Sequence, residues 1–190
     1  MGLDMYLYRA PKGVLDELKS IPYFVREIYE PLITIKECRE LYENLTDEDM
    51  KLIGEILEKL YERYPILKEM KIRDIDGFIF RLPSEEICYW REANAIHRWF
   101  VENVQNGEDD CDFYKVTREQ LEELLWTCKK VKENPELASK LLPTMDGFSF
   151  GSIEYDEWYF RKLDETIEQL EKVLEEVDFD KYDVIYHSSW

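Results

Sequence analysis

The sequence lacks the patterns that mark secreted, zinc-binding and membrane-spanning proteins. Its four cysteines are widely spaced, with no CxxC pair and no histidine at ligand-like spacing, so neither a zinc site nor a redox motif is indicated. The amino-terminal stretch carries Asp4 and has no apolar core of a signal peptide. No apolar run approaches the roughly 20 residues that a membrane-spanning helix needs. We therefore expect free thiols and a cytoplasmic location.

Signatures of cofactor binding and catalysis are also missing. The sequence contains no GxGxxG or Walker A motif, no nucleophile elbow around a serine and no paired-histidine metal motif. We expect no cofactor and no metal. One acidic run could attract a hard cation, but its spacing matches no EF-hand loop, and a solvated loop is the favoured interpretation of its residues: Glu108, Asp109, Asp110 and Asp112.

Basic residues are scarce relative to acidic ones. The chain has 25 Lys and Arg against 43 Asp and Glu, a formal net charge of -18. This balance disfavours direct binding to nucleic acid or to an anionic membrane, because both need a concentrated excess of positive charge. A small ligand, a cation or a basic protein partner remains. The alternative is that the acidic surface serves only solubility.

The pattern of apolar residues predicts an α+β fold, mostly helical, in a single compact domain over residues 1–190. Leu3, Met5 and Leu7 alternate with other residues, as in a half-buried strand. Further strands of a small antiparallel sheet are expected around Phe80 and Phe148. The carboxyl-terminal alternation, residues 184–189, is typical of an edge strand.

Capping patterns predict several helices. Thr117 with Gln120 opens one helix, and another is expected from about Asp156 to Val177. Earlier helices are expected after Thr34 and Thr46, the second with apolar residues on one face and Glu and Lys on the other. The segment from residue 11 to residue 70 carries no functional motif.

The stretch from Ser84 to about Gln105 is predicted to form one continuous helix. Its apolar stripe comprises Tyr89, Ala93, Ile96, Phe100 and Val104. At 100° per residue, Trp90, Asn94 and His97 share one border of that stripe. In a binding hypothesis, Trp90 stacks a flat ligand while Asn94 and His97 hydrogen-bond to it. In the alternative, they are ordinary boundary residues whose polar atoms bond a neighbouring loop.

Asp156 projects onto the apolar stripe of its own helix, so its carboxylate must be paired, capping or functional. The simplest interpretation is that it caps the helix amino terminus. A catalytic hypothesis pairs it with His97, one of only two histidines. It requires the two side chains to lie within hydrogen-bond reach, directly or through water.

Four blocks stand out as sequence signatures: MGLDMYL at 1–7, YWREANAIHRWFVENVQ at 89–105, YDEWY at 155–159 and SSW at 188–190. Together with the run from Leu141 to Phe148, they resemble a family of uncharacterised proteins from bacteriophages and prophages. The resemblance implies a setting in the host-cell cytoplasm but no particular activity. The resemblance makes the polar and aromatic residues of these blocks candidate site residues: Asp4, Trp90, Arg91, Asn94, His97, Asp156 and Trp190.

Three functions follow as hypotheses, in order of preference. The first is a non-enzymatic binding protein with a pocket for a small nucleotide-like ligand, lined by Asp4, Trp90, Arg91, Asn94, His97 and Trp190. The second is an acidic interaction protein that occupies the basic nucleic-acid site of a host protein. The third is a small-molecule enzyme that uses His97 and Asp156.

Overall fold

The computed structural model describes residues 2–16, 46–48, 51, 55, 58–59, 62–63, 65 and 84–190. The chain divides into two compact units: one comprises Met1–Arg9 and Glu86–Trp190, and the other comprises Ala10–Glu85. The single domain expected over residues 1–190 stays a prediction.

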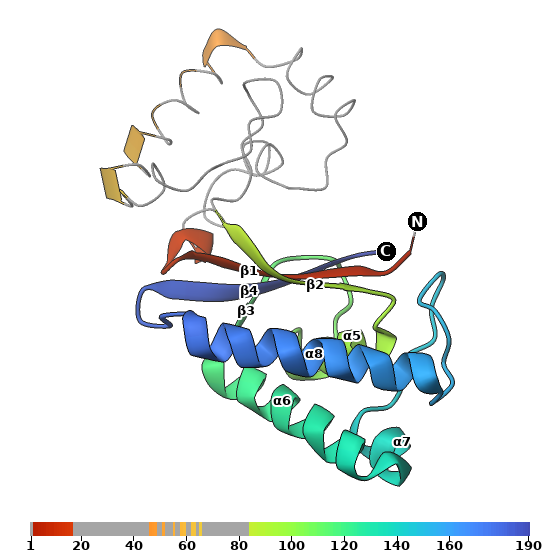
Figure 1. Ribbon diagram of the computed structural model, residues 1–190. Coiled ribbons are helices and arrows are strands. Elements are labelled where there is room, and N and C mark those ends of the chain that lie inside the picture. The colour runs from red at the N-terminus through yellow and green to blue at the C-terminus, as the bar shows by residue number, and fades with distance from the viewer. Residues whose placement is uncertain are drawn as a thin grey trace. The chain divides into compact units, whose positions relative to one another are not determined.

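A four-stranded antiparallel sheet organises the first unit, which confirms the expected α+β class. Its strands are β1 (Asp4–Pro11), β2 (Glu85–Arg91), β3 (Tyr114–Val116) and β4 (Tyr182–Ser189), in the order β2-β1-β4-β3 (Figure 1). In the β3–β4 pair, Tyr114 lies opposite Tyr186 and Val116 opposite Val184. The expected edge position of the carboxyl-terminal strand is therefore wrong, since β4 has a neighbour on both sides.

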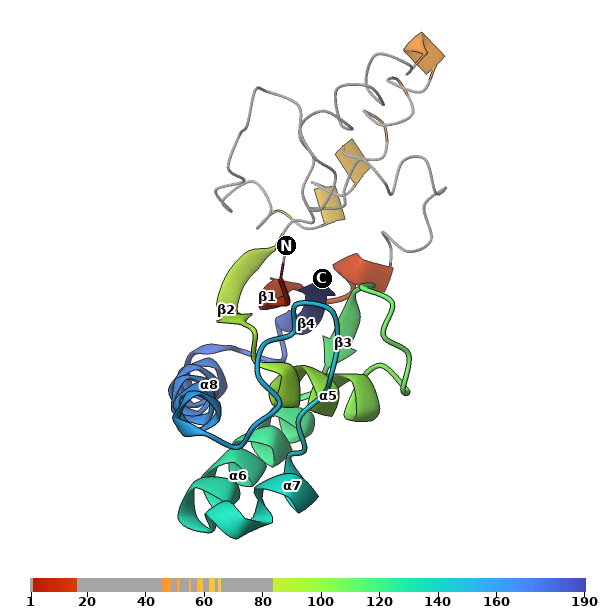
Figure 2. The same ribbon diagram turned by 90° about the vertical axis from the view of Figure 1, so that its right-hand side faces the viewer.

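Two helices, α5 (Asn94–Asn103) and α8 (Glu157–Glu176), lie on one face of this sheet (Figures 1 and 2). A third, α6 (Arg118–Glu133), packs against α8 on the side away from the sheet. Between α6 and α8 lie a short 3-10 turn, Pro135–Leu137, and α7 (Ala138–Leu141). The predicted capping box of Thr117 and Gln120 is confirmed at the start of α6. No helix in the described ranges is both long and apolar enough to cross a bilayer.

The core lies between the sheet and these helices. Leu3, Met5 and Leu7 are fully buried, as their alternation predicted, because every second residue of a strand faces the same side. Burying each such side chain contributes about 1.5–3 kcal/mol. The helices supply the facing residues, among them Ile96, Phe100, Leu121, Leu124, Leu163 and Leu170.

The predicted helix from Ser84 to Gln105 is wrong in its first half. Residues 85–91 form β2, in which Cys88 and Trp90 are buried while Tyr89 is exposed, a period of two rather than 3.6. Glu92 then takes a φ of 54°, which breaks the chain direction before α5 begins at Asn94. Pairing with β1 decides the conformation here, and a single-sequence pattern does not reveal that pairing.

Two smaller expectations about the sheet also fail. Residues 148–150 are not a strand, because Ser149 has a φ of 62° and the segment turns there. Strand β3 was not predicted, because it is only three residues long and too short for an alternating pattern to stand out.

In the second unit, eight of the residues that the structure describes after residue 16 are charged, exposed and helical: Asp47, Glu48, Lys51, Glu55, Glu58, Lys59, Glu62 and Arg63. They agree with the charged face expected for the helix after Thr46. Its apolar face, the helix after Thr34 and the strand around Phe80 lie outside the described residues.

Candidate functional site

Trp90 lies in the interior of the first unit, on β2. Its indole Nε1–H donates a hydrogen bond to Thr166 Oγ1 of α8 over 3.0 Å, and its ring is tilted against Phe100. The side chain is almost completely inaccessible to solvent. Trp90 therefore ties β2 to α8 and presents no face on which a ligand could stack.

His97 is also buried, on α5, and both of its ring nitrogens have partners. Nδ1 lies 2.7 Å from the hydroxyl oxygen of Tyr186, and Nε2 lies 2.9 Å from Asp109 Oδ2. Burial lowers the pKa of His97, although Asp109 opposes that shift. A neutral ring satisfies every group in this network. Its Nε2–H donates a hydrogen bond to Asp109, and its Nδ1 accepts a hydrogen bond from the Tyr186 hydroxyl.

Asp109 has a structural role that its sequence context does not predict. Its Oδ2 contacts His97, and its Oδ1 accepts the indole Nε1–H of Trp190 over 3.0 Å. The carboxylate thus joins α5 to the residue that follows β4. The expectation that Asp109 belongs to a merely solvated loop is wrong, because two hydrogen bonds fix its side chain.

The catalytic pairing of His97 with Asp156 is not formed. Asp156 is the N-cap of α8, where its Oδ1 accepts the backbone N–H of Tyr159 over 3.1 Å. The contacts of the His97 ring nitrogens are to Tyr186 and Asp109 instead. The capping interpretation of Asp156 is confirmed, and the enzyme hypothesis, which lacks a direct hydrogen bond between the two side chains, stays a prediction.

Asp4 and Arg91 lie on the opposite face of the sheet from Trp90, because they alternate with buried residues along β1 and β2. Asp4 Oδ1 accepts hydrogen bonds from the Tyr89 hydroxyl at 2.5 Å and from the Arg91 guanidinium at 3.2 Å. The bond to Asp4 raises the pKa of Tyr89. The predicted site residues therefore do not converge on one place.

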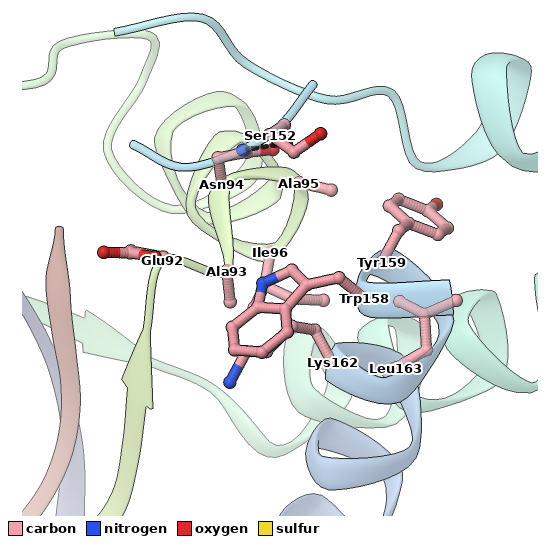
Figure 3. Close-up of a pocket in the computed structure, with 10 residues that line it drawn as sticks. All are labelled: Glu92, Ala93, Asn94, Ala95, Ile96, Ser152, Trp158, Tyr159, Lys162 and Leu163. Carbon is pink, nitrogen blue, oxygen red and sulfur yellow. Dashed lines mark hydrogen bonds between the residues drawn. The ribbon is translucent and has the colours of Figure 1, made fainter. Parts of the chain in front are cut away.

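One pocket lies beside Asn94 (Figure 3). It is bounded by the end of β2, the start of α5 and α8, and residues that line it include Glu92, Asn94, Ser152, Trp158 and Lys162. Its volume is about 10 Å³, which holds a single water molecule. Small-molecule sites are typically about 300–1,000 Å³, so this pocket is too small for a nucleotide-like ligand.

Asn94 instead holds the segment that connects α7 to α8. Its Nδ2 donates to the carbonyl oxygens of Phe150 and Ser152 over 3.0 and 2.9 Å, and its Oδ1 accepts from Met145 N at 3.4 Å. The dashed bond to Ser152 is visible in Figure 3. A buried amide that satisfies three backbone groups fixes this segment much as a strand neighbour would.

Further hydrogen bonds fix the same segment. Thr144 Oγ1 donates to the carbonyl of Ile153 over 3.0 Å, and Arg98 donates to the carbonyl of Thr144 over 3.1 Å. Leu3 N donates to the carbonyl of Ser149 over 3.3 Å. Figure 2 shows the segment passing across α5 toward the end of the sheet at which β1 begins and β4 ends.

Phe150 anchors the middle of the segment in the interior. Its ring meets His97 edge-on, with centroids 5.3 Å apart, and lies 5.8 Å from the ring of Trp190. Gly147 makes this geometry possible, since a Cβ there would come within 2.6 Å of the Phe150 ring. The buried network around His97 thus contacts the segment on its core-facing side through Phe150.

This segment and the first turn of α8 expose several large apolar side chains. Residues 146–158, which we call the aromatic segment, carry four of the seven exposed large hydrophobic side chains in the described part of the chain: Phe148 (85% exposed), Ile153 (47%), Tyr155 (38%) and Trp158 (40%). Clustered apolar side chains on a rigid surface mark interaction sites, and aromatic residues are enriched at protein interfaces. Because Phe148 was predicted to lie in a strand, this surface was not expected from the sequence.

No protein-family model matches the sequence, and neither the curated proteins nor the solved structures yield a match. The resemblance to bacteriophage and prophage proteins therefore stays a prediction.

Proposed function

We propose that this chain is a non-enzymatic protein-binding module and that its aromatic segment is the docking surface. The observation that carries the proposal is the exposure of Phe148, Ile153, Tyr155 and Trp158 within 11 residues of a segment that is fixed from beneath. A protein that had no partner would gain stability by burying these side chains, which are worth about 1.5–3 kcal/mol each.

The support beneath the segment favours binding. Asn94 fixes the backbone at three points, and Phe150 anchors it in the core. A partner therefore meets a surface whose ordering cost has already been met during folding, which leaves more of the contact energy for affinity. Binding loops on rigid scaffolds follow this plan.

A protein partner fits this surface better than the other classes do. The nearby pocket has room for one water molecule, which is too little for a metabolite. The net charge of -18 opposes direct binding to nucleic acid. The narrower hypotheses, that the partner is a host nucleic-acid-binding protein and that the chain acts in the host cytoplasm, stay predictions.

Site-specific photo-crosslinking tests the proposal. Benzoylphenylalanine replaces Phe148, a position chosen because its ring is 85% exposed and its replacement leaves the core intact. The matched control places the same photoreactive residue at Trp126, which is 59% exposed on α6 outside the aromatic segment. Both proteins are irradiated in the cells that naturally express the chain.

We expect a discrete crosslinked protein from position 148 that is missing from position 126. The crosslinked partner protein, once purified, should bind the unmodified chain. The double variant F148A/W158A should weaken that binding at least tenfold, because apolar anchors dominate interface energies. Equal crosslinking from both positions, or none from position 148 in a folded protein, would overturn the proposal.

A further inference from the structure

The aromatic segment is acidic as well as apolar. Between Lys140 and Arg161 the sequence has no basic residue, while Asp146, Glu154 and Glu157 stand among the exposed aromatic side chains. Asp156 also lies here, but its carboxylate caps α8. The surface that a partner would meet therefore combines aromatic rings with three carboxylates.

Within the part of the chain that the structure describes, these three carboxylates form no ion pair, although Arg161 and Lys162 stand over the ring of Trp158 beside Glu157. Elsewhere on the first unit, acidic side chains form ion pairs with helical neighbours or with adjacent elements. Arg98 pairs with Glu102 at 2.7 Å, Lys132 with Asp164 at 2.7 Å and Lys129 with Glu171 at 2.5 Å. The aromatic segment thus presents uncompensated negative charge at the place where apolar side chains are exposed.

The first unit already uses aromatic rings to hold guanidinium groups. The guanidinium carbon of Arg161 lies 3.9 Å from the ring centroid of Trp158, and Arg118 and Arg9 stand over Phe179 and Tyr182 at 5.3 Å. The face of an aromatic ring attracts a cation, and guanidinium stacks on it better than ammonium. Arg161 and Lys162 already stand over Trp158, so the rings that an incoming arginine can use beside the carboxylates are those of Phe148 and Tyr155.

From this juxtaposition of unpaired carboxylates and exposed rings, we infer that the partner is a basic protein that places arginine side chains against Phe148 and Tyr155. The inference rests on the proposed function and names the chemistry of the partner. Arginine would pair with Asp146, Glu154 or Glu157 while it stacks on a neighbouring ring. The net charge of -18 would speed the encounter with a basic surface and repel acidic ones.

The test measures the affinity of the full chain for a short labelled peptide that alternates arginine and leucine, at physiological ionic strength. A second peptide carries lysine in place of every arginine. The variant D146N/E154Q/E157Q removes the three carboxylates of the aromatic segment. Its control, E123Q/E168Q/E175Q, removes the same charge from exposed positions on α6 and α8.

We expect the segment variant to weaken binding of the arginine peptide by about tenfold, and the control variant by less than about twofold. The lysine peptide should bind about threefold more weakly than the arginine peptide. Equal losses in the two variants would reduce the interaction to net charge and overturn the inference, as would equal affinity for the two peptides or no binding of either. If the crosslink from position 148 persists in any of those cases, the proposed docking surface stands and only the chemistry of its partner is wrong.

Discussion

Two regions of the first unit differ in which side chains they bury. Trp90, Asn94 and His97 carry polar atoms, yet all three are buried and each has hydrogen-bond partners. The aromatic segment carries large apolar side chains, yet Phe148 and Trp158 face solvent. An unusual combination of residue types in the sequence is therefore weaker evidence of function than large apolar side chains that the fold leaves exposed.

The two regions nevertheless depend on each other. Asn94 holds the backbone of the aromatic segment, and His97 packs edge-on against Phe150. Residues that resemble a ligand site in sequence thus position a surface about fifty residues further along the chain. Residues in the two regions should therefore respond very differently to the same substitution.

The sharpest contrast is between two phenylalanines that are two residues apart. Phe150→Ala should lower the free energy of unfolding by about 3–5 kcal/mol, because the ring is buried and its removal leaves a cavity. Phe148→Ala should change it by less than about 0.5 kcal/mol, because that ring is exposed. Urea denaturation measures both. A similar loss for the two variants would contradict the division into anchor and docking residues.

Acid should destabilise the protein through its histidines. His187, whose ring stacks on Phe113 at 4.3 Å, is buried, and burial lowers its pKa from 6.5 to about 4. As pH falls below 6.5 the unfolded chain takes up a proton that the folded chain refuses until about pH 4. Stability should therefore fall by roughly 3 kcal/mol across this window, measured by urea denaturation at several pH values.

His187→Phe is the matched variant for the acid effect. It keeps an aromatic ring beside Phe113 but cannot be protonated, so its loss of stability between pH 6.5 and 4 should be smaller. Part of the remaining loss comes from His97, whose pKa burial also lowers. Parallel pH profiles for the variant and the unmodified chain would show that His187 is not kept neutral by the fold.

Asn94→Ala tests the support of the aromatic segment. The variant loses the bonds to Phe150, Ser152 and Met145 and leaves buried backbone groups without a partner, which should cost about 1–3 kcal/mol. Amide hydrogen exchange at Met145 should accelerate more than exchange in α6, because the damage is local. Uniform acceleration over the whole unit would argue against a specific role in holding the segment.

Much of the fold could be predicted from sequence because local signals and tertiary packing agree there. The capping box at Thr117 and the N-cap at Asp156 satisfy backbone groups locally, so their helices begin where expected. The stretch before α5 could not be predicted in this way. A helical stripe through Tyr89 and Ala93 fits the sequence, but β2 gains more by pairing with β1, and Glu92 supplies the turn with a positive φ.

The site was harder to predict than the fold, for a related reason. Asn94, His97 and Trp90 are close in the sequence, but their partners Phe150, Tyr186 and Thr166 are 56 to 89 residues away. Nothing local indicates that such distant groups will satisfy them. A usable signal for the aromatic segment was present: Phe148, Ile153 and Tyr155 are interleaved with acids and glycines just before the helix predicted from about Asp156, and Trp158 stands in the first turn of that helix.

The smallest expected effect compares two tryptophans given the same substitution. Trp190→Phe keeps a ring beside Phe150 but deletes the indole donor to Asp109, which should cost about 1 kcal/mol. Trp158→Phe removes an indole from the aromatic segment and should change stability by less than about 0.5 kcal/mol. Because Trp190 is itself 49% exposed, water can replace part of the lost bond, which keeps the expected difference small. Urea denaturation of both variants resolves it, and a greater loss for Trp158→Phe would place the aromatic segment among the elements that hold the fold together.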